Sequence, residues 1–356
     1  MGISDRFARR MDSAPRTGAR RIGKAKLLVG GGIAVAAAGA LAATALAGAG
    51  SAIAITSAGN AKPAAASSSG YQFVTIGDHK DRTFNQILGI NNNGRIAAYF
   101  GSGAAGHPNR GFTITAPYAQ GDIKNENFPG AAQTQSIGLN NMGEQVGFYV
   151  TGNGSNFGWY FDGSFHKVEF PTNSNAKPPV DQLLGVNDHG IAVGFYNNVK
   201  GVARGYEYNI NNHRFSLVTE PGAPTGGAAP SLTASGINNH GAVAGFYTTA
   251  GGVVKGFLKL AGGQFTSLAV PGAASTTAFG VNDNNAVVGT YTVGTGNAAT
   301  THGFVWHPGR GFLRNVDDPA GVGATTLNGI NNEGDIVGFY TDAAGNTDGL
   351  VAFPAF

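Results

Sequence analysis

The stretch GINNEGDIVGFY, residues 329–340, is the last of six copies of one phrase in this chain. Successive copies start 49, 47, 51, 44 and 49 residues apart, and the earlier ones begin at Gly89, Gly138, Gly185, Gly236 and Gly280. Each copy joins two short apolar, β-prone runs through Asn-Asn/Asp-X-Gly. Asn and Gly readily adopt the left-handed backbone of tight turns, so each phrase predicts a β-hairpin. One copy has Asn285 in place of the turn glycine, which fits the same conformation.

A second pair of runs follows each hairpin. The first of them starts with Gly and, in five of the six repeats, an aromatic residue, as at Gly158-Trp159; the second ends just before a proline in several repeats, as at Phe170-Pro171. Each repeat therefore holds four short strands, which we call a to d in chain order. Four strands in 40–50 residues are the content of one propeller blade.

The two ends of the repeat region complement each other. Residues 71–76 read as a strand d with no a, b or c ahead of it, and the last repeat stops after strand c, at residues 349–353. Pairing of these segments would complete the sixth blade and remove two open sheet edges. We therefore predict an all-β fold over residues 71–356. It is a six-bladed β-propeller of four-stranded antiparallel blades, with its ring closed by the N-terminal strand.

A glycine recurs inside strand b of five copies: Gly147, Gly194, Gly245, Gly289 and Gly338. The first copy has Ala98 instead. Because a glycine inside a strand marks close backbone approach or a bulge, we expect neighbouring blades to crowd together here.

The repeated phrase, followed by a short loop and Gly-Phe, resembles the HAF-type extracellular repeat family. His302-Gly303-Phe304 comes closest to the His-Ala-Phe tripeptide of that family. The other copies depart at the His position, which holds Arg110, Phe157, Arg204, Lys255 and Asp348. The resemblance implies an exported protein with a propeller-like fold, and it carries no established reaction or catalytic residues.

The N-terminal region indicates export. Residues 1–26 hold eight Lys/Arg and two Asp, and residues 27–61 hold no charged residue. A basic segment followed by an apolar one with Ala-X-Ala sites is typical of a signal peptide, and this apolar stretch is also just long enough for a membrane anchor. We expect residues 1–50 to be a signal peptide or signal anchor, helical or disordered, and residues 51–70 to be a flexible leader. Arg20-Arg21 leaves both the general secretory and the twin-arginine route open. The expected location is secreted or cell-envelope, with a membrane association only through an uncleaved N-terminal segment.

Composition excludes several kinds of function. The chain has a net charge of +3, but residues 27–356 carry 15 Lys/Arg and 18 Asp/Glu, so the basic character belongs to the export segment. A nucleic-acid-binding domain needs a clustered basic face, and none is visible. Without cysteine there is no disulfide, thiol nucleophile or Cys-ligated metal. The eight histidines lack zinc-site spacing, and no catalytic or phosphate-binding motif is present. We expect no catalytic residue, metal or cofactor, no nucleic-acid partner, and a monomer.

One constellation predicts a binding surface. Four repeats have a basic residue directly before the Gly of strand c: Arg110, Arg204, Lys255 and His302. An aromatic residue ends strand b in every repeat: Phe100, Tyr149, Tyr196, Tyr247, Tyr291 and Tyr340. Because b–c loops and d–a crossovers of a propeller share one face, these groups are expected to ring that face. Such a ring could bind an anionic glycan by charge and stacking. Packing of the aromatics between blades, with the basic residues as ordinary solvated loop residues, is the competing interpretation.

Three functions remain open at this point. The first is an exported, non-catalytic propeller that binds an extracellular polysaccharide, an envelope polymer or a protein partner. The second is an extracellular polysaccharide hydrolase or lyase, which would need two carboxylates converging at the mouth of the central channel. The third is a purely structural envelope protein.

Overall fold

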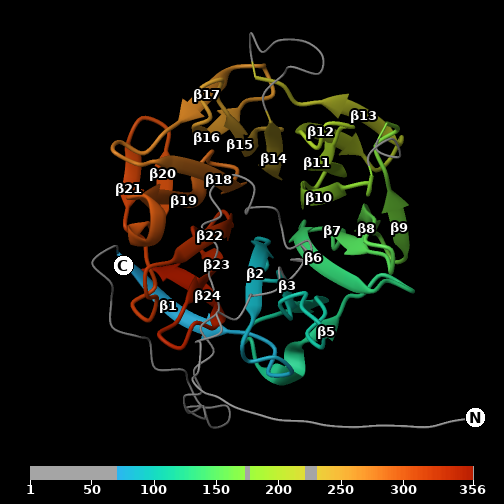
Figure 1. Cartoon of the computed structure of the whole chain (residues 1–356), viewed down its shortest axis with the longest axis horizontal. Coiled ribbons are helices and arrows are strands. Elements are labelled where there is room, and N and C mark those ends of the chain that lie inside the picture. Colours follow the sequence, from blue (N-terminus) through green and yellow to red (C-terminus); the bar gives the residue numbers. More distant parts are fainter. Residues whose placement is uncertain (1–69, 173–176, 221–230, 356) are drawn as a thin grey trace, which may run out of the picture.

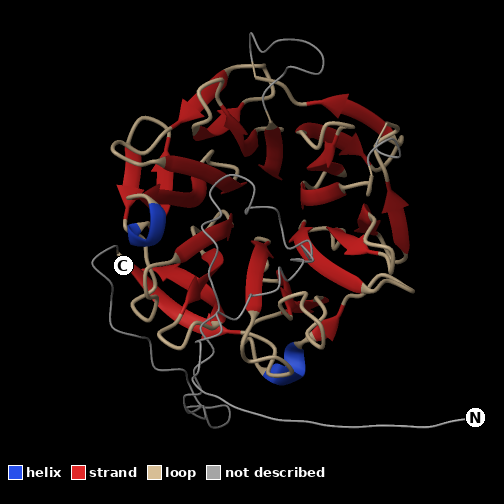
Figure 2. Ribbon diagram, viewed as in Figure 1, coloured by secondary structure: helices blue, strands red, loops and turns tan. Residues whose placement is uncertain are grey.

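The computed structural model describes residues 70–172, 177–220 and 231–355. Within them, six separate four-stranded antiparallel sheets stand around a central axis (Figure 1), which confirms the predicted six-bladed propeller. Strand a of each blade is innermost and strand d outermost. The helices among the described residues are two short 3-10 turns, η2 (Gln120–Asp122) and η4 (Gly296–Ala298), and strands dominate the rest (Figure 2).

The strands follow the repeats in order. The first three blades consist of β2 (Asn85–Ile90), β3 (Ile96–Phe100), β4 (Arg110–Ile114) and β5 (Lys124–Asn125); β6 (Gln133–Leu139), β7 (Gln145–Val150), β8 (Asn156–Phe161) and β9 (Phe165–Val168); and β10 (Asp181–Val186), β11 (Ile191–Asn197), β12 (Ala203–Asn209) and β13 (Arg214–Leu217). The last three consist of β14 (Leu232–Ile237), β15 (Val243–Thr248), β16 (Val254–Lys259) and β17 (Phe265–Leu268); β18 (Ser275–Val281), β19 (Val287–Val293), β20 (Thr300–His307) and β21 (Gly311–Arg314); and β22 (Thr325–Ile330), β23 (Ile336–Thr341), β24 (Thr347–Pro354) and β1 (Tyr71–Ile76).

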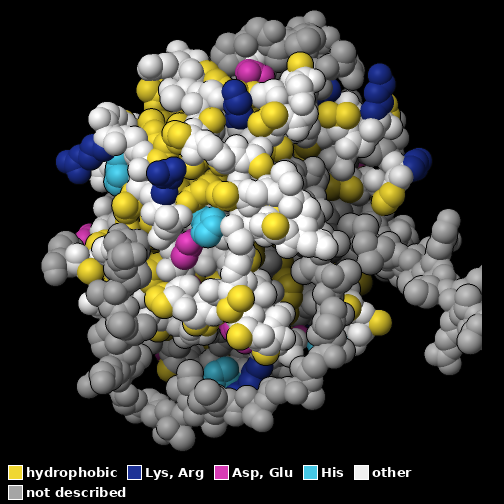
Figure 3. Space-filling model, turned by 60° about the vertical axis from the view of Figure 1, so that its left-hand side comes forward, with side chains coloured by type: hydrophobic (Ala, Val, Ile, Leu, Met, Phe, Trp, Pro, Cys, Tyr) yellow, Lys and Arg dark blue, Asp and Glu magenta, His cyan; other side chains and the backbone are white. Residues whose placement is uncertain are grey.

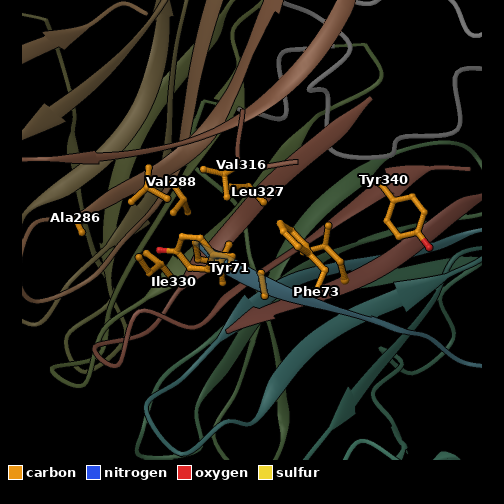
Figure 4. Close-up of a cluster of buried hydrophobic side chains, with 12 residues drawn as sticks. Tyr71, Phe73, Ala286, Val288, Val316, Leu327, Ile330 and Tyr340 are labelled. Carbon is orange, nitrogen blue, oxygen red and sulfur yellow. The ribbon is translucent and has the colours of Figure 1, made fainter. Parts of the chain in front are cut away.

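The N-terminal strand closes the ring as predicted. β1 pairs antiparallel with β24, in a register that runs from Tyr71 opposite Pro354 to Ile76 opposite Gly349. The sixth blade has the order β1-β24-β23-β22, so its outermost strand comes from the other end of the chain. Tyr71 and Phe73 point into a buried cluster with Val288 and Leu327, which spans the fifth and sixth blades (Figure 4). Phe73 is only 2% exposed, so β1 is anchored by packing as well as by its ladder.

The first glycine of every phrase brings neighbouring blades together. Each lies in strand a, directly after a β-bulge such as the register shift between Ile87 and Gly89. A Cβ on Gly89 would lie 2.6 Å from the carbonyl oxygen of Ile137 in the next blade, and one on Gly236 would lie 2.5 Å from that of Phe279. Equivalent contacts follow around the ring, ending with Gly329 against Leu88 O at 2.9 Å. These glycines let the six inner strands approach closely, a role that the sequence analysis did not assign.

The glycines inside strand b are crowded, but by a neighbour other than the predicted one. A Cβ on Gly245 would lie 2.1 Å from the carbonyl oxygen of Thr233 and 2.7 Å from the ring of Phe257. Thr233 is on strand a and Phe257 on strand c of the same blade. The bulge in strand a pushes its carbonyl toward the glycine, so the expectation of crowding between blades is wrong at these positions.

The Asn-X-X-Gly segments form the predicted turns. The Oδ1 of Asn91 accepts the backbone N–H groups of Asn93 and Arg95, at 3.0 and 2.9 Å, and Gly94 has a φ of +71°. Asn285 takes the same left-handed conformation, with a φ of +57°. The Nδ2 of Asn91 also donates to the carbonyl oxygen of Asn140 in the next blade, at 3.0 Å. One side chain thus stabilises its own turn and joins two blades.

The predicted signal segment, residues 1–50, lies outside the described residues, as does the predicted leader except for Gly70. None of the helices in the described part of the chain is long and apolar enough to cross a membrane.

Candidate functional site

The two faces of the propeller carry different chemistry. Because neighbouring strands are antiparallel throughout, the a–b and c–d turns share one face, which we call the turn face. The b–c loops and the d–a crossovers share the other, which we call the crossover face. The predicted binding residues lie where strand b ends and strand c begins, so they belong to the crossover face.

The basic and aromatic residues of the predicted site are direct cross-strand partners. The pairs are Phe100 with Arg110, Tyr196 with Arg204, Tyr247 with Lys255, and Tyr291 with His302. Side chains directly opposite each other on antiparallel strands project from the same face of the sheet and touch. All four basic side chains are partly exposed. The structure therefore repeats one basic–aromatic pair, at equal register, in four blades.

The five tyrosines that end strand b in the second to sixth blades are buried, as the competing interpretation expected. Tyr149 and Tyr196 are 8% exposed, Tyr247 is 5% exposed, and Tyr291 and Tyr340 are 4% exposed. Tyr149 stacks on Phe128 at 3.9 Å between ring centroids, and Tyr196 stacks on Phe170 at 4.0 Å. Phe128 and Phe170 come from the crossover that enters the blade, so each ring is covered by the incoming chain. A ligand on this face would meet the basic group first, and the binding role of the tyrosines stays a prediction.

The second and sixth blades depart from the pattern. In the second blade Tyr149 faces Phe157, and the Nζ of Lys167 on strand d lies 3.7 Å from the centroid of the Phe157 ring. A cation from strand d thus covers the position that strand c leaves apolar. In the sixth blade Tyr340 faces Asp348. Burial, together with the nearby carboxylates of Asp342 and Asp318, raises the pKa of Asp348 to about 6.

His302 in the fifth blade lies between two polar side chains. Its Nδ1 lies 2.7 Å from Asp317 Oδ2, and its Nε2 lies 2.9 Å from the hydroxyl of Thr300. Asp317 Oδ1 also accepts the backbone N–H of Gly303, at 2.8 Å. In the first blade the amide of Asn127 accepts the equivalent N–H of Gly111. Acceptance of this backbone N–H is therefore a structural role, which Asn127 fills in a blade without a histidine. In the fifth blade the Asp317 carboxylate fills the same role and also holds the imidazole of His302 in place.

A ring of six side chains surrounds the channel mouth on the turn face. Its members hold the second position of each turn, and each accepts the backbone N–H of its counterpart in the preceding blade at 2.8–2.9 Å. We call them the asparagine ring: Asn92, Asn141, Asp188, Asn239, Asp283 and Asn332. The sequence analysis interpreted these residues as turn formers only. The identical spacing of an amide or carboxylate in all six turns was the signal that could have revealed the ring.

Two carboxylates do converge at this mouth, but their oxygens are occupied. Asp188 Oδ2 accepts the side-chain N–H groups of Asn141 and Asn239, and Asp283 Oδ2 accepts those of Asn239 and Asn332. Although burial opposes ionisation, the hydrogen bonds from Asn332 and Asn239 hold the pKa of Asp283 below its ordinary value. A general acid needs a raised pKa, so Asp283 does not suit the role that a glycosidase would require.

Asp181 is a buried carboxyl that the sequence analysis missed. It is fully buried between the second and third blades, where it accepts the hydroxyl of Tyr206 and the backbone N–H of Phe170. Burial raises its pKa to about 7, although both hydrogen bonds favour the ionised form. Thr134, Thr276 and Thr325 accept the equivalent crossover N–H in other blades. Asp181 therefore has a structural role. No sequence motif marks it, and only knowledge of which positions are buried would have revealed it.

Potential metal ligands and basic side chains are dispersed over the described part of the chain. No group of three or more potential metal-ligating side chains gathers there. On the face shown in Figure 3, the described Lys and Arg side chains stand apart from one another and form no continuous patch.

No family model matches the sequence, and no curated protein matches it either. Several solved structures are similar in fold. AofleA from Arthrobotrys oligospora is 13% identical, with 79% of this chain and 85% of that chain covered and a TM-score of 0.47. A six-bladed fungal lectin, that of Aleuria aurantia, is 11% identical, with 64% and 76% covered and a TM-score of 0.38. An ulvan lyase is 12% identical, with 76% and 78% covered and a TM-score of 0.40. At such identities a shared function does not follow from a shared fold.

Proposed function

We propose that the protein is an exported, non-catalytic binding module that holds an anionic extracellular or cell-envelope glycan on its crossover face. The observation that carries the proposal is the repetition of one basic–aromatic pair at equal register, in Phe100–Arg110, Tyr196–Arg204 and Tyr247–Lys255. The HAF-type resemblance and the predicted signal segment support export.

The chemistry of these pairs suits carboxylate or sulfate groups on a sugar chain. An Arg guanidinium presents paired donors that match the two oxygens of a carboxylate, and Lys offers a point charge. The ring that lies opposite each of these side chains on strand b would offer apolar contact to its stem. A single exposed pair of this kind binds weakly. Because the pairs repeat around the ring, a polymer could engage several at once, and the effective concentration of each further contact would raise the overall affinity.

The test compares two triple variants of the full chain on an acidic polysaccharide column. Arg110→Gln, Arg204→Gln and Lys255→Gln together remove the three repeated cations. The control changes Lys124, Arg214 and Arg310 to Gln, which removes the same charge from exposed positions at or near c–d turns. We expect the first variant alone to elute at clearly lower salt, most visibly from a column loaded at low ionic strength.

Other outcomes favour the other functions. Equal elution of the two variants and the unmodified protein would overturn the proposal and leave the purely structural role. Release of oligosaccharides from the polymer during incubation would overturn its non-catalytic part and favour a polysaccharide hydrolase or lyase.

A further inference from the structure

The outermost strand of the sixth blade has an open edge at the rim of the propeller. β1 pairs with β24 on its inner side, and its other side lies at the rim (Figure 1). The carbonyl oxygen of Gly70 accepts the backbone N–H of Ala355 at 2.7 Å. In an antiparallel ladder alternate residues bond to the same neighbour, so every second residue counted from Gly70 bonds to β24. Phe73 and Thr75 are among the residues between, and they direct their N–H and C=O groups away from β24.

These outward groups are open within the described part of the chain. No described residue bonds to the backbone N–H or C=O of Phe73 or Thr75 across the rim. Beyond the end of β1 the edge is covered, because the side chain of Gln120 in the first blade donates to the carbonyl oxygen of Gly77 at 2.7 Å. The open edge therefore lies on β1 itself.

β1 also lacks the features by which edge strands avoid pairing with other chains. It holds six residues, Tyr-Gln-Phe-Val-Thr-Ile, with no charged residue and no proline. The outermost strands of the other blades hold two or four residues, and four of these strands carry a basic residue: Lys124, Lys167, Arg214 and Arg314. The outermost strand of the fourth blade, β17, is uncharged but shorter than β1. A long, uncharged edge is a template for a further strand.

We propose that β1 is a homodimer interface, at which it pairs antiparallel with β1 of a second copy of this chain. Phe73 of each copy would lie opposite Thr75 of the other, and each such pair would exchange both of its N–H···O=C bonds. The same register places Val74 opposite its counterpart, and apolar β-branched side chains are well suited to such cross-strand contact. The two four-stranded sixth blades would then form one continuous sheet.

A second copy is the partner that suits this edge. The open groups of Phe73 and Thr75 are complementary to the same groups of an identical strand, so the pairing extends the existing β1–β24 ladder without any change in either ring. No charge opposes the contact, whereas pairing of two β9 or two β13 strands would bring like charges of Lys167 or Arg214 together. Because a single pair of strands is a small interface, we expect a dissociation constant on the order of 100 μM. The monomer predicted from the sequence would prevail at lower concentration.

Sedimentation velocity of the full chain at increasing concentration tests the proposal. We expect a dimer that grows with concentration and dissociates on dilution. Thr75→Pro removes an outward N–H from each copy, and its ring obstructs the partner strand. Proline is tolerated on edge strands where the N–H faces solvent, so β1 should still pair with β24. The hydrogen bonds lost from both copies should weaken the dimer at least tenfold.

Thr75→Val is the matched control. Both variants lose the hydrogen bond between the Thr75 hydroxyl and the Tyr340 hydroxyl, but Thr75→Val keeps the backbone N–H. It should therefore dimerise like the unmodified protein. Thermal melting shows whether each variant is folded. If Thr75→Pro is not folded, Thr75→Lys takes its place, because a lysine at this exposed edge position should also oppose pairing.

Several results would overturn the proposal. One is a monomer at concentrations well above about 100 μM. Another is equal association of Thr75→Pro and Thr75→Val, which would indicate a contact elsewhere, such as the uncharged residues 27–61 that all variants share. A dimer that persists on dilution would also overturn it, because exchange of β1 between rings would then replace edge pairing. The crossover-face cations play no part in this test, so its result is independent of the glycan proposal.

Discussion

The backbone N–H of Asn332 donates to the Oδ1 of Asn92 at 2.9 Å, although 240 residues separate them in the sequence. This bond closes the asparagine ring. On the turn face it performs the task that β1 performs at the outer edge of the sixth blade, since each joins the last repeat to a segment near the start of the described chain.

Removal of the Asn92 side chain is expected to weaken the closure of the asparagine ring. Asn92→Ala takes away the acceptor of Asn332 N–H while its own N–H still donates to Asn141 Oδ1. Because the site is exposed and water can replace the lost partner, we expect a loss of about 1 kcal/mol in the free energy of unfolding. Chemical denaturation measures it, and Asn93→Ala, at the exposed neighbouring turn position, is the control. A loss of the same size in both variants would show that the turn matters and the ring does not.

Crowding at the strand-b glycines predicts intolerance of larger residues. A side chain at Gly245 would have to displace both the carbonyl of Thr233 and the ring of Phe257. Gly245→Val is therefore expected to destabilise the protein by about 1–3 kcal/mol or more, the general range for overpacking. Gly262→Val serves as the control, because nothing lies within 4 Å of a Cβ built there and its φ is ordinary. Matching melting temperatures for Gly245→Val and the unmodified protein would rule out the crowding argument.

Asp181 predicts a pH dependence of stability. Its pKa of about 7 in the folded state exceeds the ordinary carboxyl value of 3.8, so the folded protein binds this proton more tightly than the unfolded chain. Below about pH 4 Asp181 is protonated in both the folded and the unfolded state, so its ionisation does not lower the free energy of unfolding. As the pH rises through 4 to 7, the unfolded state ionises first and stability falls, by about 1.4 kcal/mol for each unit of pKa difference.

Asp181→Asn tests this dependence. The variant keeps the shape and a hydrogen-bond acceptor but cannot ionise, so its stability should be flatter than that of the unmodified protein between pH 4 and 7. Urea denaturation at several pH values gives the comparison. Parallel curves for the two proteins across that window would mean that the pKa of Asp181 is the same in the folded and unfolded states.

Asp348 predicts a pH dependence of glycan binding, which rests on the proposed function. Below its pKa of about 6 the carboxyl is neutral, so the sixth blade stops repelling a polyanion. Retention on a sulfated polymer, whose charge is constant in this range, should be stronger at pH 5 than at pH 7.5. Asp348→Asn should raise retention at pH 7.5 and reduce the difference between the two pH values. If the variant and the unmodified protein elute together at both pH values, Asp348 does not meet the ligand.

The repeat phrase was sufficient to predict the fold because its information is local. Asn91 and Gly94 form their turn from their own side chain and backbone, and six such turns at one spacing leave few architectures. The asparagine ring and the partners of the strand-a glycines are different, because each contact joins residues 44–51 positions apart in neighbouring blades, or 240 apart at the closure. Their geometry depends on blade packing, which the phrase alone does not encode. Asp181 breaks the repeat, and its burial becomes visible only once the blades pack around it.

The reciprocal pairing of β1 with β24 has a consequence for assembly. The six register pairs from Tyr71–Pro354 to Ile76–Gly349 are the same whether the two strands belong to one molecule or to two. The burial of Phe73 would likewise be the same in both arrangements, so the closed monomer is favoured by the high local concentration of its own tethered strand. Concentrated refolding would thus be expected to yield domain-swapped dimers and chains, in which each ring borrows its final strand from a neighbour.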